Sequence, residues 1–369
     1  MSVRRGTVAC AVTATLALTL AACGSDDNID QTGIDIPEIE CTGKSTINAS
    51  GSTAQANAMT RFINIYESAC PGFSVNYNSS GSGAGVSEFL GAQTHFAGTD
   101  IPLQEQHGEV ADARERCGGN EAWNLPLVFG PIAITYHLEG VEDLVLDGPA
   151  IAQIFNGSIT SWDDEYLAEL NEGTELPDED ITVIFRSDES GTTENFQRYL
   201  RTAAPDHWEQ GVGKVFQGGV GEGASGNENT SSAVTRTPGS ITYNEWSFAK
   251  QHGLQTADVI NSGGGEPVPL SDETAARAID AAEIAGQGHD LELDLDSIYG
   301  TEQPGAYPLM LASYEVVCSR YPDGDVSDSV QRFLHVAATY GQQGLAEAGF
   351  TPLPEAFQER LVSSIEAIS

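Results

Sequence analysis

Three short segments of the chain combine serine, threonine and glycine where a predicted strand gives way to a predicted helix. They are residues 51–53, 81–85 and 190–192. A helix N-terminus presents unpaired backbone N–H groups and the positive end of the helix dipole, glycine lets the backbone approach a ligand, and hydroxyl groups add donors. A serine or threonine before a single helix is usually an ordinary N-cap. Three such segments that converge on a cleft would hold a tetrahedral oxyanion.

Arg186 follows the predicted strand 181–185 and comes just before the third segment. Its planar guanidinium can donate two parallel hydrogen bonds to a phosphate or a carboxylate. Asp188, two residues further along the chain, is expected to hold that guanidinium. The alternative is an exposed salt bridge, because the chain has 54 Asp and Glu residues and only 16 Lys and Arg residues.

Asp100 ends the predicted strand 95–99, at the carboxyl edge where α/β sheets bind ligands. A carboxylate repels a fully ionised anion. It accepts a hydrogen bond from an anion that still carries a proton, as hydrogen phosphate does and sulfate at neutral pH does not. The alternative role is a helix cap before Pro102. If Asp100 contacts the ligand, the site favours oxyanions that carry a proton over fully ionised ones.

The usual catalytic arrangements are not found in the sequence. Ser82 and Ser190 do not lie in a Gly-x-Ser-x-Gly elbow, and the seven histidines have no metal-ligand spacing. An isolated histidine such as His95 is expected to be structural. We therefore expect a binding protein that uses no metal and no cofactor. A phosphatase or a serine hydrolase is the rival from another class.

The formal net charge of −38 bears on the choice of partner. Nucleic acid is a poor partner, because its phosphate backbone needs a basic protein face. A small anion can still bind, because surface charges are screened over about 8 Å at physiological salt and donors in direct contact govern the site.

Residues 1–22 have the layout of a secretory signal peptide. Two arginines precede an apolar run that is too short to cross a bilayer, and small residues lead to Cys23. The segment 20–24 (LAACG) is similar to a bacterial lipobox, which predicts cleavage before Cys23 and acyl chains on that cysteine. A plain secreted protein is the alternative. Residues 23–44 are predicted to form the lipidated N-terminus and an acidic tether.

Four cysteines remain after the lipobox. They are Cys41, Cys70, Cys117 and Cys318. Export favours two disulfides over a metal site, and no close Cys/His spacing predicts zinc. Three pairings are possible, and we favour Cys70 with Cys117 and Cys41 with Cys318.

Strand and helix patterns alternate after the tether. A short strand at residues 45–50 precedes a helix that begins at about residue 54. This helix places four apolar side chains on one face, namely Met59, Phe62, Ile63 and Tyr66. Alternating apolar residues at 73–77 predict the next strand, and helical spacing resumes at 86–90. This βαβ organisation predicts an α/β fold with a mainly parallel sheet.

Two extended apolar stretches occur at residues 125–136 and 307–317. Gly130 and Pro131 interrupt the first of them. Both stretches are predicted to cross between two α/β lobes. The Gly- and Ser-rich segment 218–232 is predicted to be a mobile loop.

The predicted lobes follow from these crossings, because the chain is too long for one ordinary domain. Lobe I consists of residues 45–128 and 307–369, and lobe II consists of residues 129–306. Two crossing strands would form a hinge, with the ligand in the cleft between the lobes.

Five motifs occur in the order and with the spacing seen in the phosphate-binding proteins of bacterial phosphate ABC transporters. They are residues 51–54 (GSTA), 81–85 (GSGAG), 99–103 (TDIPL), 154–164 (IFNGSITSWDD) and 186–193 (RSDESGTT). The chain resembles this family from about residue 45 to the C-terminus. The resemblance implies the two-lobed fold of periplasmic binding proteins.

The resemblance also implies which residues bind the ligand in lobe I. Thr53 provides its hydroxyl and backbone donors together with the N–H of Ala54, and Ser82 provides its hydroxyl. Asp100 accepts the proton of the ligand, and Ser52 has a supporting role.

In lobe II, the resemblance implies that Arg186 clamps two ligand oxygens while Asp188 holds its guanidinium. Ser190, Gly191 and Thr192 supply further donors. The Trp-Asp-Asp motif at 162–164 is structural in the family.

Three positions depart from the pattern of the family. Many relatives have an aromatic residue where Ala54 stands. Glu189 replaces a common glycine and adds a negative charge beside the site, which predicts weaker binding. The segment 226–229 lacks a glycine that is often found there.

The function implied by the resemblance is the capture of inorganic phosphate outside the cytoplasmic membrane. The protein would be a monomer, anchored through Cys23 to the outer face of that membrane, and would deliver phosphate to the permease subunits of an ABC importer. The alternatives are the same fold binding arsenate, sulfate or molybdate, and a signalling or adhesive lipoprotein that has kept the fold.

Overall fold

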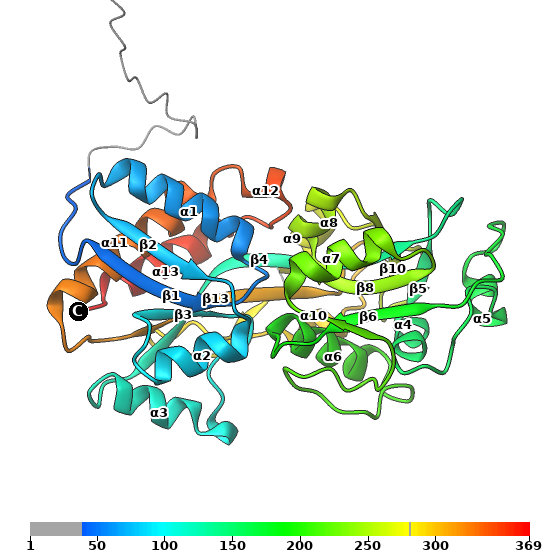
Figure 1. Ribbon diagram of the computed structural model, residues 1–369, viewed down its shortest axis with the longest axis horizontal. Coiled ribbons are helices and arrows are strands. Elements are labelled where there is room, and N and C mark those ends of the chain that lie inside the picture. Colours follow the sequence, from blue (N-terminus) through cyan, green and yellow to red (C-terminus); the bar gives the residue numbers. More distant parts are fainter. Residues whose placement is uncertain (1–38, 280–281) are drawn as a thin grey trace, which may run out of the picture. The chain divides into compact units, whose positions relative to one another are not determined.

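A mixed nine-stranded sheet runs through the computed structural model, which describes residues 39–279 and 282–369 (Figure 1). Its strand order is β2-β1-β3-β13-β4-β8-β6-β7, and β9 pairs with β4 beside this path. In chain order the strands of this sheet are β1 Thr46–Gly51, β2 Ser74–Asn78, β3 Phe96–Thr99, β4 Ala122–His137, β6 Thr182–Arg186, β7 Glu222–Ala224, β8 Ser240–Glu245, β9 Gln255–Thr256 and β13 Met310–Cys318.

Two small two-stranded sheets also occur in the described part of the chain. A parallel pair joins β5 (Val145–Asp147) to β10 (Asp258–Ile260), and an antiparallel pair joins β11 (Glu283–Ile284) to β12 (Leu293–Asp294).

Thirteen α-helices and two short 3₁₀-helices occur in the described residues. The α-helices are α1 Ala56–Ala69, α2 Ser82–Leu90, α3 Glu109–Arg116, α4 Gly148–Phe155, α5 Glu165–Leu170, α6 Gly191–Ala203, α7 Gly226–Arg236, α8 Trp246–His252, α9 Asp272–Ile279, α10 Asp296–Tyr299, α11 Gly324–Ala338, α12 Leu345–Ala348 and α13 Glu355–Glu366. The 3₁₀-helices are η1 Glu105–His107 and η2 Tyr340–Gln342. The predicted α/β class is confirmed.

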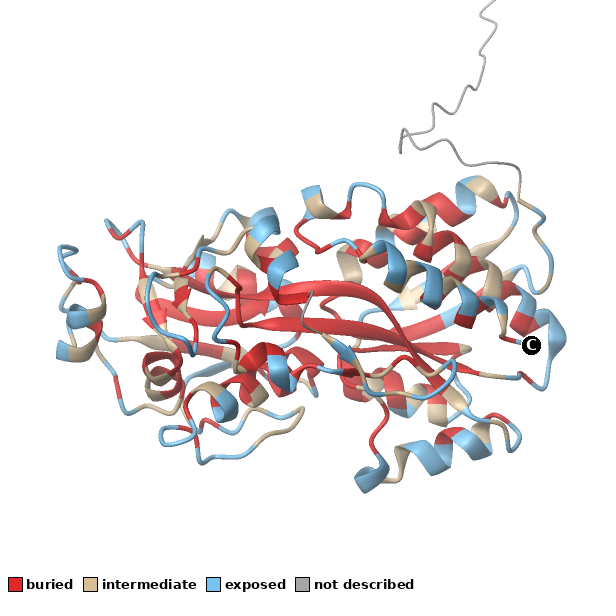
Figure 2. Cartoon of the chain, turned by 180° about the vertical axis from the view of Figure 1, so that it is seen from behind, coloured by how far each residue is buried: buried red, intermediate tan, exposed pale blue. Residues whose placement is uncertain are grey.

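The large sheet contains two parallel sections with antiparallel strands between them. Strand β1 pairs in parallel with β2 and β3, and β6 pairs in parallel with β7 and β8. Strand β4 lies antiparallel to β13 over its first part and to β8 over residues 132–137. Both β4 and β13 are almost wholly buried, as the central strands of Figure 2 show. The long strand β4 therefore links the two sections of the sheet.

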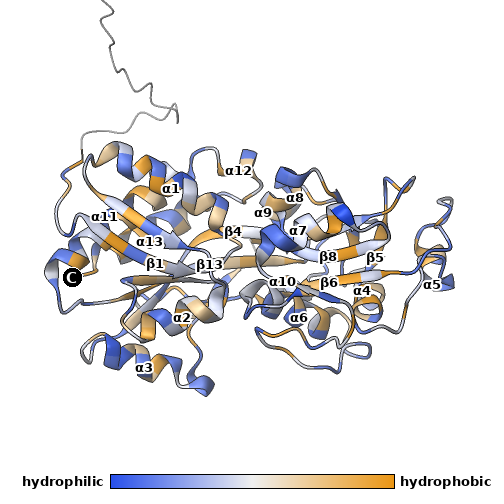
Figure 3. Cartoon of the chain, in the orientation of Figure 1, coloured by the Kyte–Doolittle hydropathy of each residue, from blue (hydrophilic) through white to orange (hydrophobic). Residues whose placement is uncertain are grey.

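Helices cover both faces of the sheet. In Figure 1, α1, α11 and α13 lie on one side of β1, β3 and β13, and α2 and α3 lie on the other. Helix α1 buries Met59, Phe62 and Tyr66 as predicted, whereas Ile63 is only partly buried and Ile65 lies in the core. Figure 3 shows hydrophilic residues over much of α3, most of which is exposed. Apolar stripes of the helices thus pack on a buried sheet, as the helical periodicity requires.

Two local predictions are wrong. The segment 218–232 is not a mobile loop, because β7 pairs with β6 and α7 begins at Gly226. Its small and polar residues hid both elements from pattern analysis. Gly130 and Pro131 do not interrupt the first apolar stretch, since β4 continues through them with Pro131 paired to Met310.

All four predicted cysteines form disulfides, but the favoured pairing is wrong. Cys41 is bonded to Cys70 (Cα–Cα 5.7 Å) and Cys117 to Cys318 (Cα–Cα 5.4 Å). Cys70 ends α1, beside the segment that leads into β1. Cys117 ends α3, and Cys318 is the last residue of β13. Each disulfide therefore joins the ends of elements that the tertiary fold brings together, which sequence spacing does not reveal.

The predicted signal peptide, Cys23 and most of the predicted tether lie outside the described residues. Within the described ranges, none of the helices has the length and apolar character needed to cross a membrane.

Candidate anion-binding site

The carboxylate of Asp100 lies where four segments of the chain meet, directly after β3. Its Oδ1 accepts short hydrogen bonds from Ser52 Oγ (2.5 Å) and Ser313 Oγ (2.7 Å). Among the described residues, the donors to its Oδ2 are more distant, namely Ser82 Oγ and Thr192 Oγ1, each at 3.4 Å. Hydroxyl-to-oxygen hydrogen bonds are normally 2.5–3.0 Å long, so Oδ1 is saturated while Oδ2 keeps acceptor capacity.

Arg186 ends β6, and its side chain is buried. Its Nε and Nη2 donate to the two oxygens of Asp188, with Nε to Oδ1 at 2.8 Å and Nη2 to Oδ2 at 2.5 Å. The N–H of Gly226 donates to the same Oδ1 at 2.9 Å. The predicted contact between Arg186 and Asp188 is confirmed. Arg186 Nη1 is buried and has no hydrogen-bond partner among the described residues, which leaves one cationic donor for a ligand.

Helix N-termini bring the second and third predicted segments together. Helix α2 begins at Ser82, and α6 begins at Gly191 after the N-cap Ser190. The N–H of Gly83 donates to the carbonyl oxygen of Glu189 at 3.0 Å. A Cβ on Gly191 would lie 2.6 Å from Ser82 Oγ, so only glycine permits this approach.

Residues of the first predicted segment, 51–53, and the neighbouring Ala54 form hydrogen bonds within the protein. Ser52 Oγ donates to Asp100, as its supporting role requires. The N–H of Ala54 donates to Ser52 Oγ at 3.0 Å, so the structure gives this predicted ligand donor an internal partner. Thr53 is buried, and its Oγ1 accepts hydrogen bonds from Asn227.

Sequence reasoning missed two polar residues of the site, Asn227 and Ser313. Asn227 is fully buried at the start of α7, in the segment predicted to be a mobile loop. Ser313 lies in β13, inside a stretch read only as apolar. A glycine followed by asparagine at a helix start was the available signal for Asn227. No local signal marked Ser313, because its role depends on where β13 pairs in the sheet.

Burial and neighbouring charges shift the pKa values of the two aspartates at this site. Burial raises the pKa of Asp100 above its usual value, against hydrogen bonds from Ser52 and Ser313 and the positive charge of Arg186, which lower it. Burial also acts to raise the pKa of Asp188, but the Arg186 guanidinium and the N–H of Gly226 outweigh it and the pKa is lowered. Asp188 is therefore the ionised partner of Arg186, and Asp100 is the more readily protonated carboxylate.

Two further carboxyl groups are buried near Asp100. Burial raises the pKa of Glu315 to about 8, and the negative charge of Asp100 adds to the rise. Neither oxygen of Glu315 has a geometric hydrogen-bond partner within the described part of the chain. Burial likewise raises the pKa of Glu245 well above its usual value. Glu315 therefore favours the neutral form at neutral pH, and burial shifts the pKa of Glu245 in the same direction.

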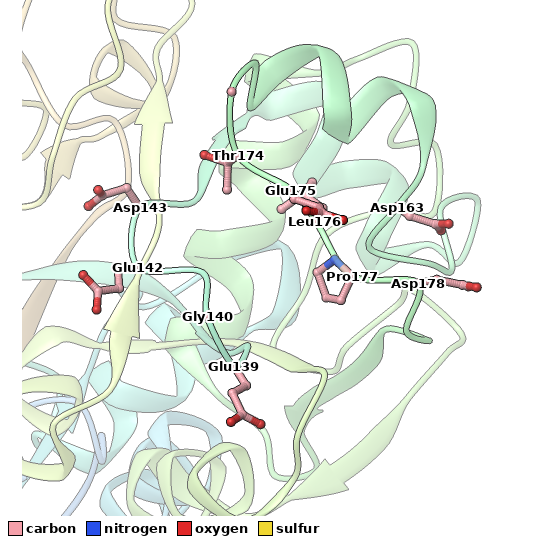
Figure 4. A pocket seen from close by; sticks show the side chains of 11 residues that line it. Glu139, Gly140, Glu142, Asp143, Asp163, Thr174, Glu175, Leu176, Pro177 and Asp178 are labelled. Carbon is pink, nitrogen blue, oxygen red and sulfur yellow. The ribbon is translucent and has the colours of Figure 1, made fainter.

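A pocket of about 830 Å³ is lined by none of the residues around Asp100, and its lining is acidic. Figure 4 shows the acidic side chains that line it. They are Glu139, Glu142, Asp143, Asp163, Glu175 and Asp178. Such a lining repels anions, so this pocket is not the anion site.

Comparison with known proteins identifies the family. Residues 37–339 match the sequence model described as the PBP superfamily domain. Phosphate-binding protein PstS 3 of Mycobacterium tuberculosis (strain ATCC 25618 / H37Rv) is 52% identical over 373 residues, which cover 100% of both chains. Phosphate-binding protein PstS 2 of the same strain is 48% identical over 371 residues, again covering 100% of both.

Solved structures share the fold. A high-affinity periplasmic phosphate-binding protein, PfluDING bound with phosphate, superposes with a TM-score of 0.69 at 21% identity, covering 86% of this chain and 93% of that chain. A phosphate-binding protein from Stenotrophomonas maltophilia gives a TM-score of 0.64 at 18% identity, covering 87% and 94%. The predicted fold of periplasmic binding proteins is confirmed. The chain therefore belongs to the PBP superfamily and, within it, to the family of PstS phosphate-binding proteins.

Proposed function

We propose that this protein captures inorganic phosphate outside the cytoplasmic membrane and delivers it to the permease subunits of an ABC importer. One observation carries the proposal. The Oδ2 of Asp100, whose hydroxyl donors are 3.4 Å away, and the Nη1 of Arg186, which has no partner among the described residues, occur among hydroxyl groups and helix N-termini. An anion that both accepts many hydrogen bonds and donates one matches this set.

Hydrogen phosphate has that combination of oxygens. Three of its oxygens accept hydrogen bonds, and the fourth carries a proton that Asp100 can accept. Sulfate and molybdate are fully ionised at neutral pH, so each would face the carboxylate without a proton to share. Arsenate carries the same proton and should bind as phosphate does. The names of the PstS relatives agree with this choice.

The proposed ligand contacts come from both sides of the site. Thr53, Ser82 and Asp100 belong to the proposed lobe I, together with the backbone of Ala54. In the proposed lobe II, the contacts are Arg186, Ser190, Gly191 and Thr192. The lobes comprise residues 45–128 with 307–369, and residues 129–306. Strands β4 and β13 serve as the hinge between them, and closure removes water from the anion and strengthens each hydrogen bond.

The proposed location is the outer face of the cytoplasmic membrane, with acyl chains on Cys23. The lipobox-like segment 20–24 and the two disulfides support it, because disulfides persist in oxidising compartments. The protein acts as a monomer and catalyses no reaction.

Calorimetric titration of the purified protein with phosphate, arsenate, sulfate and molybdate tests the proposal. We expect phosphate and arsenate to bind tightly and sulfate and molybdate not to bind. Heat from sulfate or molybdate, with none from phosphate, would replace the proposed ligand. Heat from none of the four anions would overturn the proposed function. In a separate incubation with a phosphate ester, release of the ester's alcohol would instead indicate a phosphatase.

A further inference from the structure

We propose that Asn227 is a positioning residue that makes the Thr53 hydroxyl an obligatory hydrogen-bond donor toward the bound anion. This inference rests on the proposed phosphate site. It assigns a role in ligand orientation to a residue of α7.

Asn227 donates two hydrogen bonds to the same oxygen of Thr53. The backbone N–H donates to Thr53 Oγ1 at 3.2 Å, and the side-chain Nδ2 donates to it at 2.9 Å. A hydroxyl oxygen has two acceptor lone pairs and one hydrogen. Both lone pairs are therefore occupied, and the hydrogen is the one polar function that remains. Among the described residues, none accepts a hydrogen bond from this hydroxyl.

The orientation of the Asn227 amide is determined by β8. Its Oδ1 accepts a hydrogen bond from the backbone N–H of Glu245 at 3.0 Å. Rotating the amide by half a turn would place its NH₂ group against that N–H, so two donors would face each other. The same rotation would turn Oδ1 toward Thr53. Glu245 therefore holds Nδ2 toward Thr53 and excludes the alternative.

The surroundings make this arrangement costly to break. Asn227 is fully buried, and Thr53 is 7% exposed. The carbonyl oxygen of Asn227 accepts from Ser231 Oγ at 2.8 Å, which holds the first turn of α7. Breaking any member of a buried network leaves polar groups unsatisfied.

Thr53 and Asp100 together determine which oxygen of the bound hydrogen phosphate carries the proton. Thr53 can only donate, so it must face an unprotonated oxygen. Asp100 can only accept when ionised, so the protonated oxygen must face it. Asn227 thus helps to define the rotational orientation of hydrogen phosphate without touching the anion.

A double-mutant cycle on phosphate affinity tests the inference. The variants are Thr53→Val, which removes the hydroxyl at nearly constant shape, Asn227→Asp, which removes the Nδ2 donor, and the double variant. In Asn227→Asp the Thr53 hydroxyl should turn toward the new carboxylate. We expect each single variant to weaken phosphate binding roughly 10–100-fold, as the loss of a buried hydrogen bond to an anion implies. Because both act through one hydroxyl, the double variant should bind nearly as well as the weaker single variant.

Two controls separate this role from charge and from stability. Asn229→Asp adds the same charge on the exposed side of α7, where its side chain donates a hydrogen bond to the carbonyl oxygen of Ser225, and should change the affinity less than twofold. Thr53→Ser keeps the hydroxyl and should retain most of the affinity. Thermal unfolding without phosphate reports whether each variant is folded.

Wild-type binding tests the proposed function separately from the cycle. If wild type binds no phosphate, the proposed function fails. If wild type binds but the losses of Thr53→Val and Asn227→Asp multiply, or Asn229→Asp weakens binding as much as Asn227→Asp, the role of Asn227 is overturned.

Discussion

The Oγ1 of Thr192 lies 3.4 Å from the Oδ2 of Asp100, although 92 residues separate them in the chain. The Oδ1 of the same carboxylate is held at 2.5 Å by Ser52 and at 2.7 Å by Ser313. One oxygen is therefore fixed by close donors while the other stays available. This asymmetry aims the free acceptor at the point where the helix N-termini converge.

Phosphate affinity should depend on pH through Asp100. When pH falls through its pKa, the carboxyl becomes protonated and can no longer accept the proton of the ligand, so binding weakens. Ser313→Ala removes a hydrogen bond that lowers this pKa. The decline in affinity should then begin at a higher pH than in wild type. Titrations between about pH 4 and 7 measure this, and coincident profiles would contradict the assignment of Asp100.

Arg186→Lys should weaken phosphate binding roughly 10–100-fold. The guanidinium uses Nε and Nη2 on Asp188 and leaves Nη1 for the ligand, whereas a single ammonium cannot serve both partners in that geometry. Arg201→Lys, at an exposed position of α6, is the matched control and should leave the affinity unchanged. Equal affinities for wild type and Arg186→Lys would show that Arg186 does not clamp the anion.

Glu315→Gln should stabilise the protein at neutral pH. The folded pKa of about 8 lies above the ordinary value of 4.5, so folding keeps a proton that the unfolded chain releases. The contribution of Glu315 is therefore most favourable below about pH 4.5 and is lost as pH rises toward 8. We expect the variant to gain about 2–4 kcal/mol in free energy of unfolding at pH 7, with the gain shrinking toward pH 4.5.

Urea unfolding of wild type and Glu315→Gln at several pH values measures that gain. Glu359→Gln is the control, because Glu359 is exposed on α13. A gain that does not vary with pH would mean that Glu315 is not held neutral by burial.

The observed disulfides make a separate prediction. Non-reducing peptide mapping should recover Cys41 linked to Cys70 and Cys117 linked to Cys318. Replacing Cys117 and Cys318 together by alanine should cost about 2–4 kcal/mol of unfolding free energy, because the bond constrains a long loop of the unfolded chain. Phosphate affinity should be retained. Recovery of a Cys70–Cys117 peptide would contradict the pairing.

Much of the site could be predicted from the sequence, because its chemistry is local. Ser82, Ser190 and Gly191 stand at helix starts, and Asp100 and Arg186 stand at strand ends, where α/β folds bind ligands. Asn227 and Ser313 could not be predicted in this way. Each matters through a partner distant in the chain, Thr53 in one case and Asp100 in the other. The disulfide pairing failed for the same reason, since it depends on which element ends the fold brings together.

The most direct test of the account is the ratio of phosphate to sulfate affinity in wild type and in Asp100→Asn. Parallel calorimetric titrations at neutral pH measure it. We expect wild type to prefer phosphate strongly. Asp100→Asn removes the repulsive charge, and because its amide oxygen should stay with the donors Ser52 and Ser313, an NH₂ donor replaces the acceptor Oδ2. The ratio should then fall at least roughly tenfold, as phosphate binds more weakly and sulfate more tightly. An unchanged ratio would contradict the claim that Asp100 selects the ligand by its proton.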